Sequence, residues 1–317
     1  MTQERKALLF PGQGLPPQDI IDCYHRLQTL DPIKVSKRIA TAQKAINRLL
    51  GTASFSIAAT LEDKDSPNFS MTSFVQPVVY TLSILTSEIA ETKEHTRIDL
   101  SIVAGHSLGE YSALTQAKVL PFSKGIEIVT FRGNVMQEAS EENLSLLISI
   151  NGLDEEQVKE FSQQNGAEIA LINAPTLIIV GVSKEGVVDI EKLAKEAGAR
   201  RVTILPTAGA FHTHFMQTAA TKLDEFLSKY DFSDPKVPVV PNLTGQPSNS
   251  GRALKNHLVE SMTNPVRWTK SIQTMRNVGI QLFVECGPGK SLATLNRING
   301  IPEDQTINIL DQLPQTA

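Results

Sequence analysis

The pentapeptide Gly105-His106-Ser107-Leu108-Gly109 has the form G-x-S-x-G and stands between an apolar run and a helical pattern. Glycines at both ends permit a tight, strained turn that lifts the Ser107 hydroxyl clear of the backbone. The helix that follows would aim its free N–H groups at the same point, so the Leu108 N–H would stabilise an acyl oxyanion there. The pattern therefore predicts that Ser107 is a nucleophile that forms a covalent acyl ester, with a purely structural turn as the alternative.

A serine hydroxyl needs a base to activate it, and histidine is the usual one. The chain offers six histidines, namely His25, His95, His106, His212, His214 and His257. The small-residue loop Pro206–Phe211 precedes His212 and leaves room for a substrate beside its imidazole. On the residues alone, His212 is favoured only slightly over His214. We expect His25, His95 and His257 to face solvent without a chemical role.

Composition limits the classes of function that this chain can serve. The 317 residues can bury one large core or two smaller ones, and 41% hydrophobic with 20% charged residues is ordinary for a globular protein. A net charge of -4 and a pI of about 5.9 argue against a nucleic-acid binder. Two cysteines, Cys23 and Cys286, provide neither a disulfide framework nor a zinc site, so we expect no metal and a reducing compartment, the cytoplasm.

Short apolar runs bounded by turn residues predict buried strands. They are Lys6–Phe10, Asp99–Ala104, Leu144–Ile150, Ile169–Asn173, Leu177–Val182, Arg201–Leu205, Val237–Pro241 and Leu282–Glu285. Apolar residues at helical spacing predict helices between most of these strands. These are Pro32–Leu50, Val75–Ala90, the segment after Gly109 to about Ala117, Phe122–Ala139, Asp154–Asn165, Lys184–Ala197, Phe215–Tyr230, Ala253–Ser261 and Val266–Val278.

The middle of the chain has the order βαββαβ, which is the ferredoxin-like arrangement. We therefore expect an α/β protein in which a small ferredoxin-like subdomain, residues 144–206, is inserted into a larger domain. The larger domain, residues 1–143 and 207–317, is expected to be a hydrolase-like unit with a parallel sheet. The predicted nucleophile and base lie on the two halves of this larger domain.

Seven sequence blocks resemble the acyltransferase family, which comprises the malonyl-CoA:acyl carrier protein transacylases of fatty acid synthesis and the acyltransferases of polyketide synthases. The blocks follow the order of the family and run from Phe10 to about Ile298. They are FPGQG at 10–14, GHSLGEYSAL at 105–114, FRGNVMQEA at 131–139, GAFHTHFM at 209–216, NLTGQP at 242–247, NPVRW at 264–268 and ECGPGKSL at 285–292.

The resemblance implies a two-step exchange of an acyl group between thiols, with no bound cofactor. Ser107 would attack the thioester of malonyl-CoA, and the pantetheine thiol of an acyl carrier protein would then attack the malonyl ester. His212 would be the base, oriented by the backbone carbonyl of Ser261. The backbone N–H groups of Gln13 and Leu108 would form the oxyanion hole.

The resemblance also assigns substrate contacts. Arg132 would hold the free carboxylate of the malonyl group through two parallel hydrogen bonds, which lysine cannot do. Phe211, beside the base, would crowd an α-methyl group, although simple core packing is an equal alternative. His106 would touch the acyl group or pack behind it. Gln76 and Asn173 match family positions near the pocket.

Three competing functions are compatible with the same residues. A hydrolase on the same scaffold would clear acyl groups from carrier proteins, with water replacing the thiol. A general α/β-hydrolase would use Asp154 or Asp189 as the third member of a Ser–Asp–His triad, because the chain order permits it. A non-enzymatic module would bind carrier proteins without reacting.

The expected partners are a carrier protein and a CoA thioester, and we expect a free-standing monomer that needs neither nucleic acid nor membrane. The helix at 32–50 carries a basic side over residues 34–48, made of Lys34, Lys37, Arg38, Lys44 and Arg48. Carrier proteins are acidic, so this side is a candidate docking face, with a solvated helix face as the plainer alternative.

Overall fold

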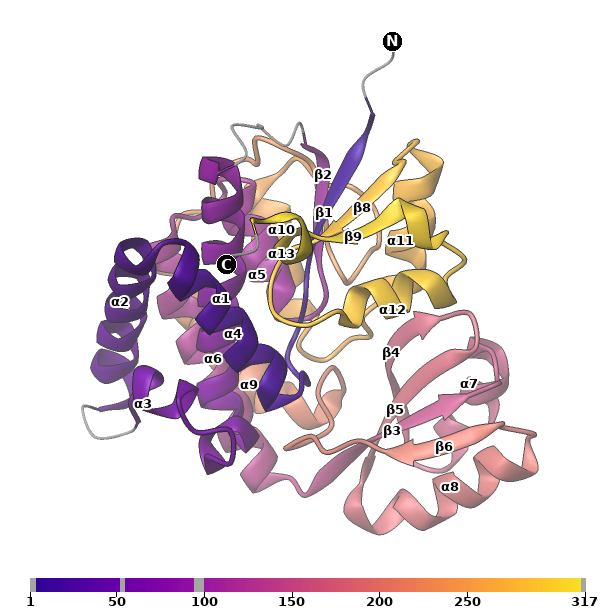
Figure 1. The fold of residues 1–317 in the computed structure, drawn as a ribbon. Coiled ribbons are helices and arrows are strands. Elements are labelled where there is room, and N and C mark those ends of the chain that lie inside the picture. The colour runs from indigo at the N-terminus through magenta and orange to yellow at the C-terminus, as the bar shows by residue number, and fades with distance from the viewer. Residues whose placement is uncertain (1–3, 52–54, 94–99, 315–317) are drawn as a thin grey trace.

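The computed structural model describes residues 4–51, 55–93 and 100–314. Its larger sheet has five parallel strands in the order β7-β2-β1-β8-β9. The strand bounds are β1 Lys6–Phe10, β2 Leu100–Gly105, β7 Val239–Val240, β8 Leu282–Glu285 and β9 Thr306–Asn308. In Figure 1, α1, α2, α4 and α6 gather on one side of the molecule, and α11 and α12 lie on the other. The parallel sheet confirms the predicted α/β fold class.

The helices of the larger unit pack against this sheet or against one another, and α4 and α5 are buried on nearly all sides. Their bounds are α1 Pro17–Leu30, α2 Pro32–Leu50, α3 Ile57–Leu61, α4 Thr72–Lys93, α5 Gly109–Gln116, α6 Phe122–Glu142, α9 Gln217–Leu227, α10 Gly251–Glu260, α11 Trp268–Asn277, α12 Ser291–Ile298 and α13 Ile309–Gln312. Helix α2 buries the residues that its 3.6-residue spacing selects, among them Val35, Ile39 and Ile46.

The smaller sheet is antiparallel with strand order β4-β5-β3-β6, which is the ferredoxin-like order. Its elements are β3 Ser145–Asn151, α7 Glu155–Gln164, β4 Glu168–Ala174, β5 Leu177–Ser183, α8 Val187–Glu196 and β6 Arg201–Ile204. Helices α7 and α8 pack on one face and enclose a separate apolar core that includes Ile148, Ile178 and Val180. The separate antiparallel sheet agrees with the predicted inserted unit, and the domain limits 144 and 206 remain predictions.

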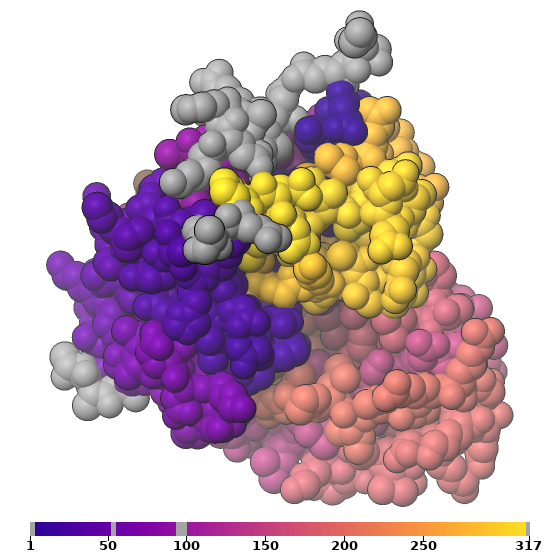
Figure 2. Space-filling model, viewed as in Figure 1, coloured from indigo at the N-terminus to yellow at the C-terminus, as the bar shows by residue number. Residues whose placement is uncertain are grey.

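The opposite face of the small sheet packs against the larger unit. Leu147, Ala170 and Ile179 belong to the main hydrophobic cluster, and Leu171 forms a parallel bridge with Val266. Figure 2 shows the surface hollowed where the indigo N-terminal part, the yellow C-terminal part and the salmon small unit meet. The two units therefore share a packed junction, and strand β4 reaches the larger unit directly.

The sequence expectations miss or lengthen several elements. The strand expected at Val237–Pro241 is shortened to Val239–Val240. Helix α1 was not predicted because Pro16 and Pro17 suggest a turn, whereas Pro17 occupies the first turn of the helix, where its missing N–H costs nothing. Strand β9 and helices α12 and α13 were also missed, since each is short and part of its apolar residues is spread among polar ones. Asp99, at the start of one expected strand, lies outside the described residues.

The turn between β2 and α5 depends on backbone contact without intervening side chains. A Cβ atom on Gly105 would lie 1.9 Å from the carbonyl carbon of Gly109. A Cβ atom on Gly109 would lie 2.1 Å from the carbonyl oxygen of Phe10, at the end of β1. Real Cβ atoms do not approach this closely, so both positions require glycine. Strands β1 and β2 and helix α5 are thereby locked together around Ser107.

Gly109→Ala should therefore destabilise the fold by about 1–3 kcal/mol or more, because the backbone of β1 must move to admit the methyl group. Urea unfolding followed by circular dichroism would measure the loss. Ser107→Ala is a matched control, since it changes the same turn by one atom without adding volume. Equal unfolding midpoints for the two variants would contradict the packing account.

Candidate active site

Ser107 occupies the turn between β2 and α5 with φ 49°, a left-handed conformation that non-glycine residues rarely adopt. The Asn242 side chain holds this turn from both sides. Its Oδ1 accepts the Ser107 backbone N–H at 2.7 Å, and its Nδ2 donates to the Gly105 carbonyl at 2.6 Å. Asn242 is 1% exposed and follows the short strand β7. The strained conformation of the serine is thus fixed by a residue from a distant part of the chain.

His212 lies within hydrogen-bond distance of the serine. Its Nε2 is 2.7 Å from Ser107 Oγ, and its Nδ1 is 2.6 Å from the backbone carbonyl oxygen of Ser261. A carbonyl can only accept, so Nδ1 carries the proton and Nε2 is left to accept the Ser107 hydroxyl. Burial, reinforced by the charge of Arg132, lowers the pKa of His212 to about 3. The imidazole is therefore neutral at neutral pH and able to take a proton.

Arg132 comes from α6 and is 2% exposed. One guanidinium nitrogen, Nη2, donates to Ser107 Oγ at 3.3 Å, and the other, Nη1, donates to Gln76 Oε1 at 2.7 Å. Its Nε has no hydrogen-bond partner, and no carboxylate lies within ion-pair distance of it among the described residues. A buried cation without an adjacent anion is costly to maintain, so this site favours an anionic ligand.

Gln76 connects the arginine to the loop after β1. It is fully buried on α4, and its Nε2 donates to Gln13 Oε1 at 2.8 Å. Leu108 stands at the N-terminal end of α5, where the first N–H groups of a helix lack partners within the helix. The structure thus brings Gln76, Gln13 and Leu108 to the neighbourhood of Ser107. Their contacts to an acyl group remain predictions.

His106 and Asn173 join the two units beside the serine. His106 Nε2 donates to Asn173 Oδ1 at 2.8 Å, and the histidine ring meets Trp268 edge-on with centroids 5.4 Å apart. The Asn173 carbonyl in turn accepts from Asn299 Nδ2 at 2.8 Å. Burial lowers the pKa of His106, so it is neutral as well. This bridge lets the small unit form one wall of the site.

Three other residues considered from the sequence pack in the core, form an ion pair or cap a helix. Phe211 is 5% exposed and belongs to the main hydrophobic cluster, which fits its packing alternative. His214 pairs with Glu168 through Nδ1 and Oε1 at 2.6 Å and is exposed, so it does not compete with His212 for the serine. Asp154 caps α7 by accepting the Gln157 N–H, away from the imidazole.

The remaining expectations concern histidines and surface charge. His25 faces solvent beside Glu62, and His95 lies outside the described residues. On the basic side at 34–48, Lys34, Arg38 and Arg48 form ion pairs with the acidic residues Asp31, Glu88 and Glu127. These pairs reduce the positive charge that this side offers to an acidic carrier protein.

Two buried residues beneath the serine turn were not assigned a role from the sequence. Asn242 opens the NLTGQP block and Glu110 lies within GHSLGEYSAL, so both stood in recognisable segments. Their function follows from tertiary contacts, since the Asn242 backbone N–H also donates to Glu110 Oε2 at 3.1 Å. An asparagine that stabilises a turn by hydrogen bonds to its backbone has no sequence pattern of its own.

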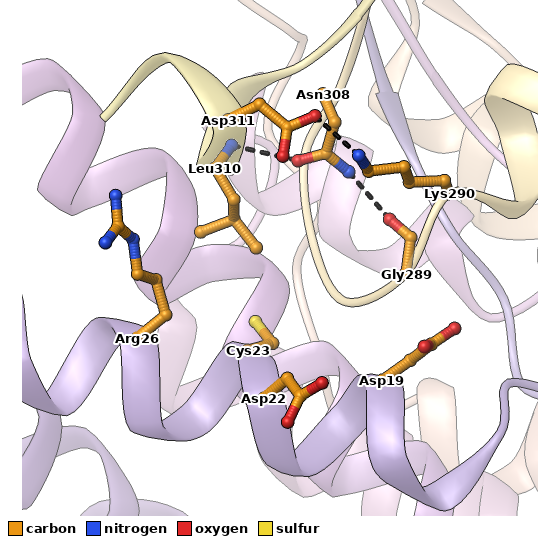
Figure 3. A pocket seen from close by; sticks show the side chains of 9 residues that line it. All are labelled: Asp19, Asp22, Cys23, Arg26, Gly289, Lys290, Asn308, Leu310 and Asp311. Carbon is orange, nitrogen blue, oxygen red and sulfur yellow. Dashed lines mark hydrogen bonds and ion pairs between the residues drawn. The ribbon is translucent and has the colours of Figure 1, made fainter. Parts of the chain in front are cut away.

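A separate cavity of about 610 Å³ lies between α1 and the C-terminal elements and does not include Ser107 (Figure 3). Its charged groups are largely engaged with one another or with the backbone. Lys290 pairs with Asp311 at 2.7 Å, and Arg26 donates to the carbonyls of Leu313 and Pro314. The candidate active site at Ser107 is separate from this cavity.

The geometry can be compared with known proteins. The profile of a family described as "Acyl transferase domain" matches residues 33–308. This chain belongs to the acyl transferase family. It is 32% identical over 294 residues to the malonyl CoA-acyl carrier protein transacylase of Bacillus subtilis, covering 91% of this chain and 88% of that protein.

Two further similarities extend the comparison. The chain is 31% identical over 294 residues to the polyketide biosynthesis protein ThaF of Burkholderia thailandensis, which covers 92% of this chain but only 24% of ThaF. A solved structure described as "PlMCAT:AntF (holo): type II PKS acyl-carrier protein in complex with its malonyl-transacylase" has a TM-score of 0.80 and 30% identity. That similarity covers 96% of this chain and 95% of the compared chain.

Within residues 4–51, 55–93 and 100–314, none of the helices is both long and apolar enough to cross a membrane. Over the same ranges, no group of three or more His, Cys, Asp or Glu side chains is arranged to hold a metal ion.

Asn242→Ala should slow formation of the acyl-enzyme by about 10- to 100-fold, because the Ser107 turn loses both hydrogen bonds that fix it. Binding of the acyl-CoA should change little, since the Asn242 side chain binds backbone groups of the turn at Ser107 and Gly105. Rapid-quench mass spectrometry at several acyl-CoA concentrations would separate the rate constant from the affinity. Asn249→Ala, an exposed asparagine in the same loop, is the control, and equal acylation rates for both variants would contradict this role.

Proposed function

We propose that this protein transfers a malonyl group from malonyl-CoA to the pantetheine thiol of an acyl carrier protein. One observation carries the proposal: Ser107 Oγ lies 2.7 Å from His212 Nε2 and 3.3 Å from Arg132 Nη2. A nucleophile, a neutral base and a buried cation thus meet at one oxygen atom. The names of the relatives support the substrate and the carrier, since they are called malonyl CoA-acyl carrier protein transacylase and malonyl-transacylase.

The first step forms the acyl-enzyme. His212 Nε2 accepts the proton of the Ser107 hydroxyl while Oγ attacks the thioester carbonyl carbon. The backbone N–H groups of Leu108 and Gln13 stabilise the oxyanion of the tetrahedral intermediate. The carbon–sulfur bond then breaks, and the CoA thiolate leaves with the proton from Nε2. Ser107 is left as a malonyl ester and His212 is again neutral.

The second step reverses these roles with a different thiol. The pantetheine thiol of the carrier protein gives its proton to His212 Nε2 and attacks the ester carbonyl. The bond to Ser107 Oγ breaks, and Oγ recovers the proton from the imidazole. Ser261 orients the ring in both steps, because the Nδ1–H remains bonded to its carbonyl. The exchange is balanced and consumes no cofactor.

Arg132 supplies the preference for a carboxylated acyl group. Its guanidinium is buried, and the described residues place no carboxylate within ion-pair distance of it, so the malonyl carboxylate would provide the missing anion. Gln76 Oε1 accepts a hydrogen bond from Arg132 Nη1 at 2.7 Å and so fixes the orientation of the guanidinium group. His106 and Asn173 shape the remaining wall and limit the size of the acyl chain.

Hydrolysis on the same scaffold is the second candidate, because it shares the Ser107 ester and differs only in the acceptor. Arg132 favours transfer, since an enzyme that clears varied acyl groups has little use for a fixed carboxylate contact. Purified enzyme mixed with malonyl-CoA and a holo carrier protein should form malonyl-carrier protein faster than free malonate. Release of malonate as the faster reaction would refute transfer as the function.

Ser107→Ala should abolish the malonyl-enzyme, because no other described side chain replaces the Oγ atom at His212. Intact-mass spectrometry after brief mixing with malonyl-CoA would detect the ester in the parent protein. The variant should keep the parent's circular dichroism spectrum. An acyl adduct formed by the variant at the parent's rate would exclude Ser107 as the nucleophile.

Arg132→Ala should reduce malonyl transfer by about 30-fold to several thousand-fold, which corresponds to roughly 2–5 kcal/mol for a buried charged contact. The rate of acetyl transfer should be unchanged or higher, because an acetyl group has no carboxylate for Arg132 to bind. The malonyl transfer rate of Arg132→Lys should lie between those of the parent and the alanine variant. Lysine keeps the positive charge but lacks the two parallel donors of the guanidinium. Equal losses for malonyl and acetyl would contradict the proposed contact.

A further inference from the structure

His212 is held in a backbone conformation that its residue type disfavours. Its φ is 63°, in the left-handed region that non-glycine residues rarely adopt. A residue keeps such a conformation only where its surroundings impose it. The hydrogen bond to the Ser261 carbonyl orients the imidazole ring, but it does not reach the backbone around His212. Further contacts to this backbone come from the small unit.

The loop around His212 packs directly on two strands of the small sheet. Two residues before the histidine, the Ala210 backbone N–H donates to Ser145 Oγ of β3 at 3.0 Å. Gly181 of β5 lies against the same loop, since a Cβ atom there would be 2.8 Å from Ala210 Cβ and 2.7 Å from Thr213 Cγ2. Thr213 Oγ1 also donates to the Ala210 carbonyl at 2.6 Å, which links the residues on both sides of His212.

Glu168, on the neighbouring strand β4, binds the chain two residues after His212. Its Oε2 accepts the His214 backbone N–H at 3.0 Å, and its Oε1 accepts from the His214 ring Nδ1 at 2.6 Å. Glu168 lies directly opposite Gly181, which lies opposite Leu147 of the main hydrophobic cluster. These side chains therefore share the face of the sheet that meets the larger unit. Strands β3, β4 and β5 thus contact the loop before and after the base.

The exposure of the Glu168–His214 pair limits what it contributes to stability. The side chains of His214 and Glu168 are 58% and 45% exposed. Exposed ion pairs add little to the stability of a fold, because solvent screens their charges. A carboxylate that binds a backbone N–H and a ring nitrogen of one residue nevertheless restricts the chain at that point. We therefore expect the pair to affect the placement of His212 more than the free energy of unfolding.

We propose that Glu168 is a positioning residue for the base: by binding His214, it keeps His212 in its left-handed conformation with Nε2 at the nucleophile. This inference rests on the proposed function, because it requires His212 to act as the base toward Ser107. The small unit then serves catalysis by fixing the backbone of the base, in addition to forming one wall of the site. Asn242 fixes the nucleophile turn in a corresponding way from the larger unit.

Glu168→Ala removes both hydrogen bonds to His214. Formation of the malonyl-enzyme should slow by about 10- to 100-fold, because a small displacement of a catalytic group is costly to the rate. The affinity for malonyl-CoA and the midpoint of urea unfolding should stay close to those of the parent. Single-turnover mass spectrometry at several malonyl-CoA concentrations would separate the rate constant from the affinity. A rate constant equal to that of the parent would overturn the proposal.

Glu168→Gln tests rescue by a side chain of the same size. Its amide oxygen can still accept the His214 backbone N–H, although the negative charge is lost. The acylation rate of this variant should therefore be restored to near that of the parent. A glutamine variant as slow as the alanine variant would contradict a role that depends on holding the backbone.

Glu191→Ala is the matched control. The Glu191 side chain is 36% exposed and pairs with Lys195 Nζ at 2.6 Å, so the ion pair is as short as that of Glu168. Glu191 lies on α8, which covers the opposite face of the small sheet. Its variant should be acylated at the rate of the parent. Equal slowing of both alanine variants would show that any ion pair of the small unit has this effect, which would overturn the specific role of Glu168.

The proton on His212 Nδ1 reports the placement of the ring directly. It is donated to the Ser261 carbonyl over 2.6 Å, and a proton in so short a hydrogen bond resonates far downfield in proton NMR spectra. This resonance should shift or broaden in Glu168→Ala and stay unchanged in Glu191→Ala. A slowed Glu168→Ala protein that keeps the resonance of the parent would overturn the positioning role.

Acylation of the parent protein separates this inference from the proposed function. Failure of malonyl-CoA to acylate Ser107 in the parent would refute the proposed function itself. Acylation of the parent and of Glu168→Ala at equal rates would refute only the role of Glu168.

Discussion

The close backbone contact among β1, β2 and α5 is the constraint on which the site depends. No side chain fits at Gly105 or Gly109, so the chain between them must turn sharply and hold Ser107 at φ 49°. That conformation is unfavourable for serine in isolation, and Asn242 stabilises it by binding the backbone on both sides of the nucleophile. The fold fixes the turn, and the Ser107 hydroxyl is thereby held within reach of His212 and Arg132. Packing elsewhere in the core compensates for the strain of the turn.

The site also depends on contact between the two units. Asn173 belongs to the small sheet, yet its side chain accepts from His106 of the nucleophile turn and its carbonyl accepts from Asn299 after α12. Apolar residues of the small sheet belong to the main hydrophobic core, so the small unit is packed firmly against the larger unit at this wall of the site. A change in the angle between the units would move Asn173 and would thereby alter the shape of the acyl pocket without any change in the reacting groups.

Much of this arrangement could be predicted from the sequence. The apolar runs gave β1 and β8 with their observed bounds, and the 3.6-residue pattern gave α2, because burial on one side leaves a periodic signal. Ser107 was suggested by its motif, and the small-residue loop before His212 favoured it slightly over His214. The resemblance to a family strengthened His212 as the base and added Arg132. The roles of Asn242 and Glu110 could not be predicted, because they depend on contacts between segments more than a hundred residues apart. Helix α1 was missed because a proline pair suggests a turn as readily as a helix start.

The orientation of His212 by the carbonyl of Ser261 has a consequence for the evolution of this site. A main-chain oxygen is present whatever side chain occupies position 261, so no single substitution there deletes the partner of the imidazole. The peptide dipole also brings no formal negative charge, in contrast to the aspartate of a serine protease triad. A pocket that admits diacids is thereby spared a permanent repulsive group next to its base, and its tolerance for anionic acyl chains can be tuned by residues elsewhere.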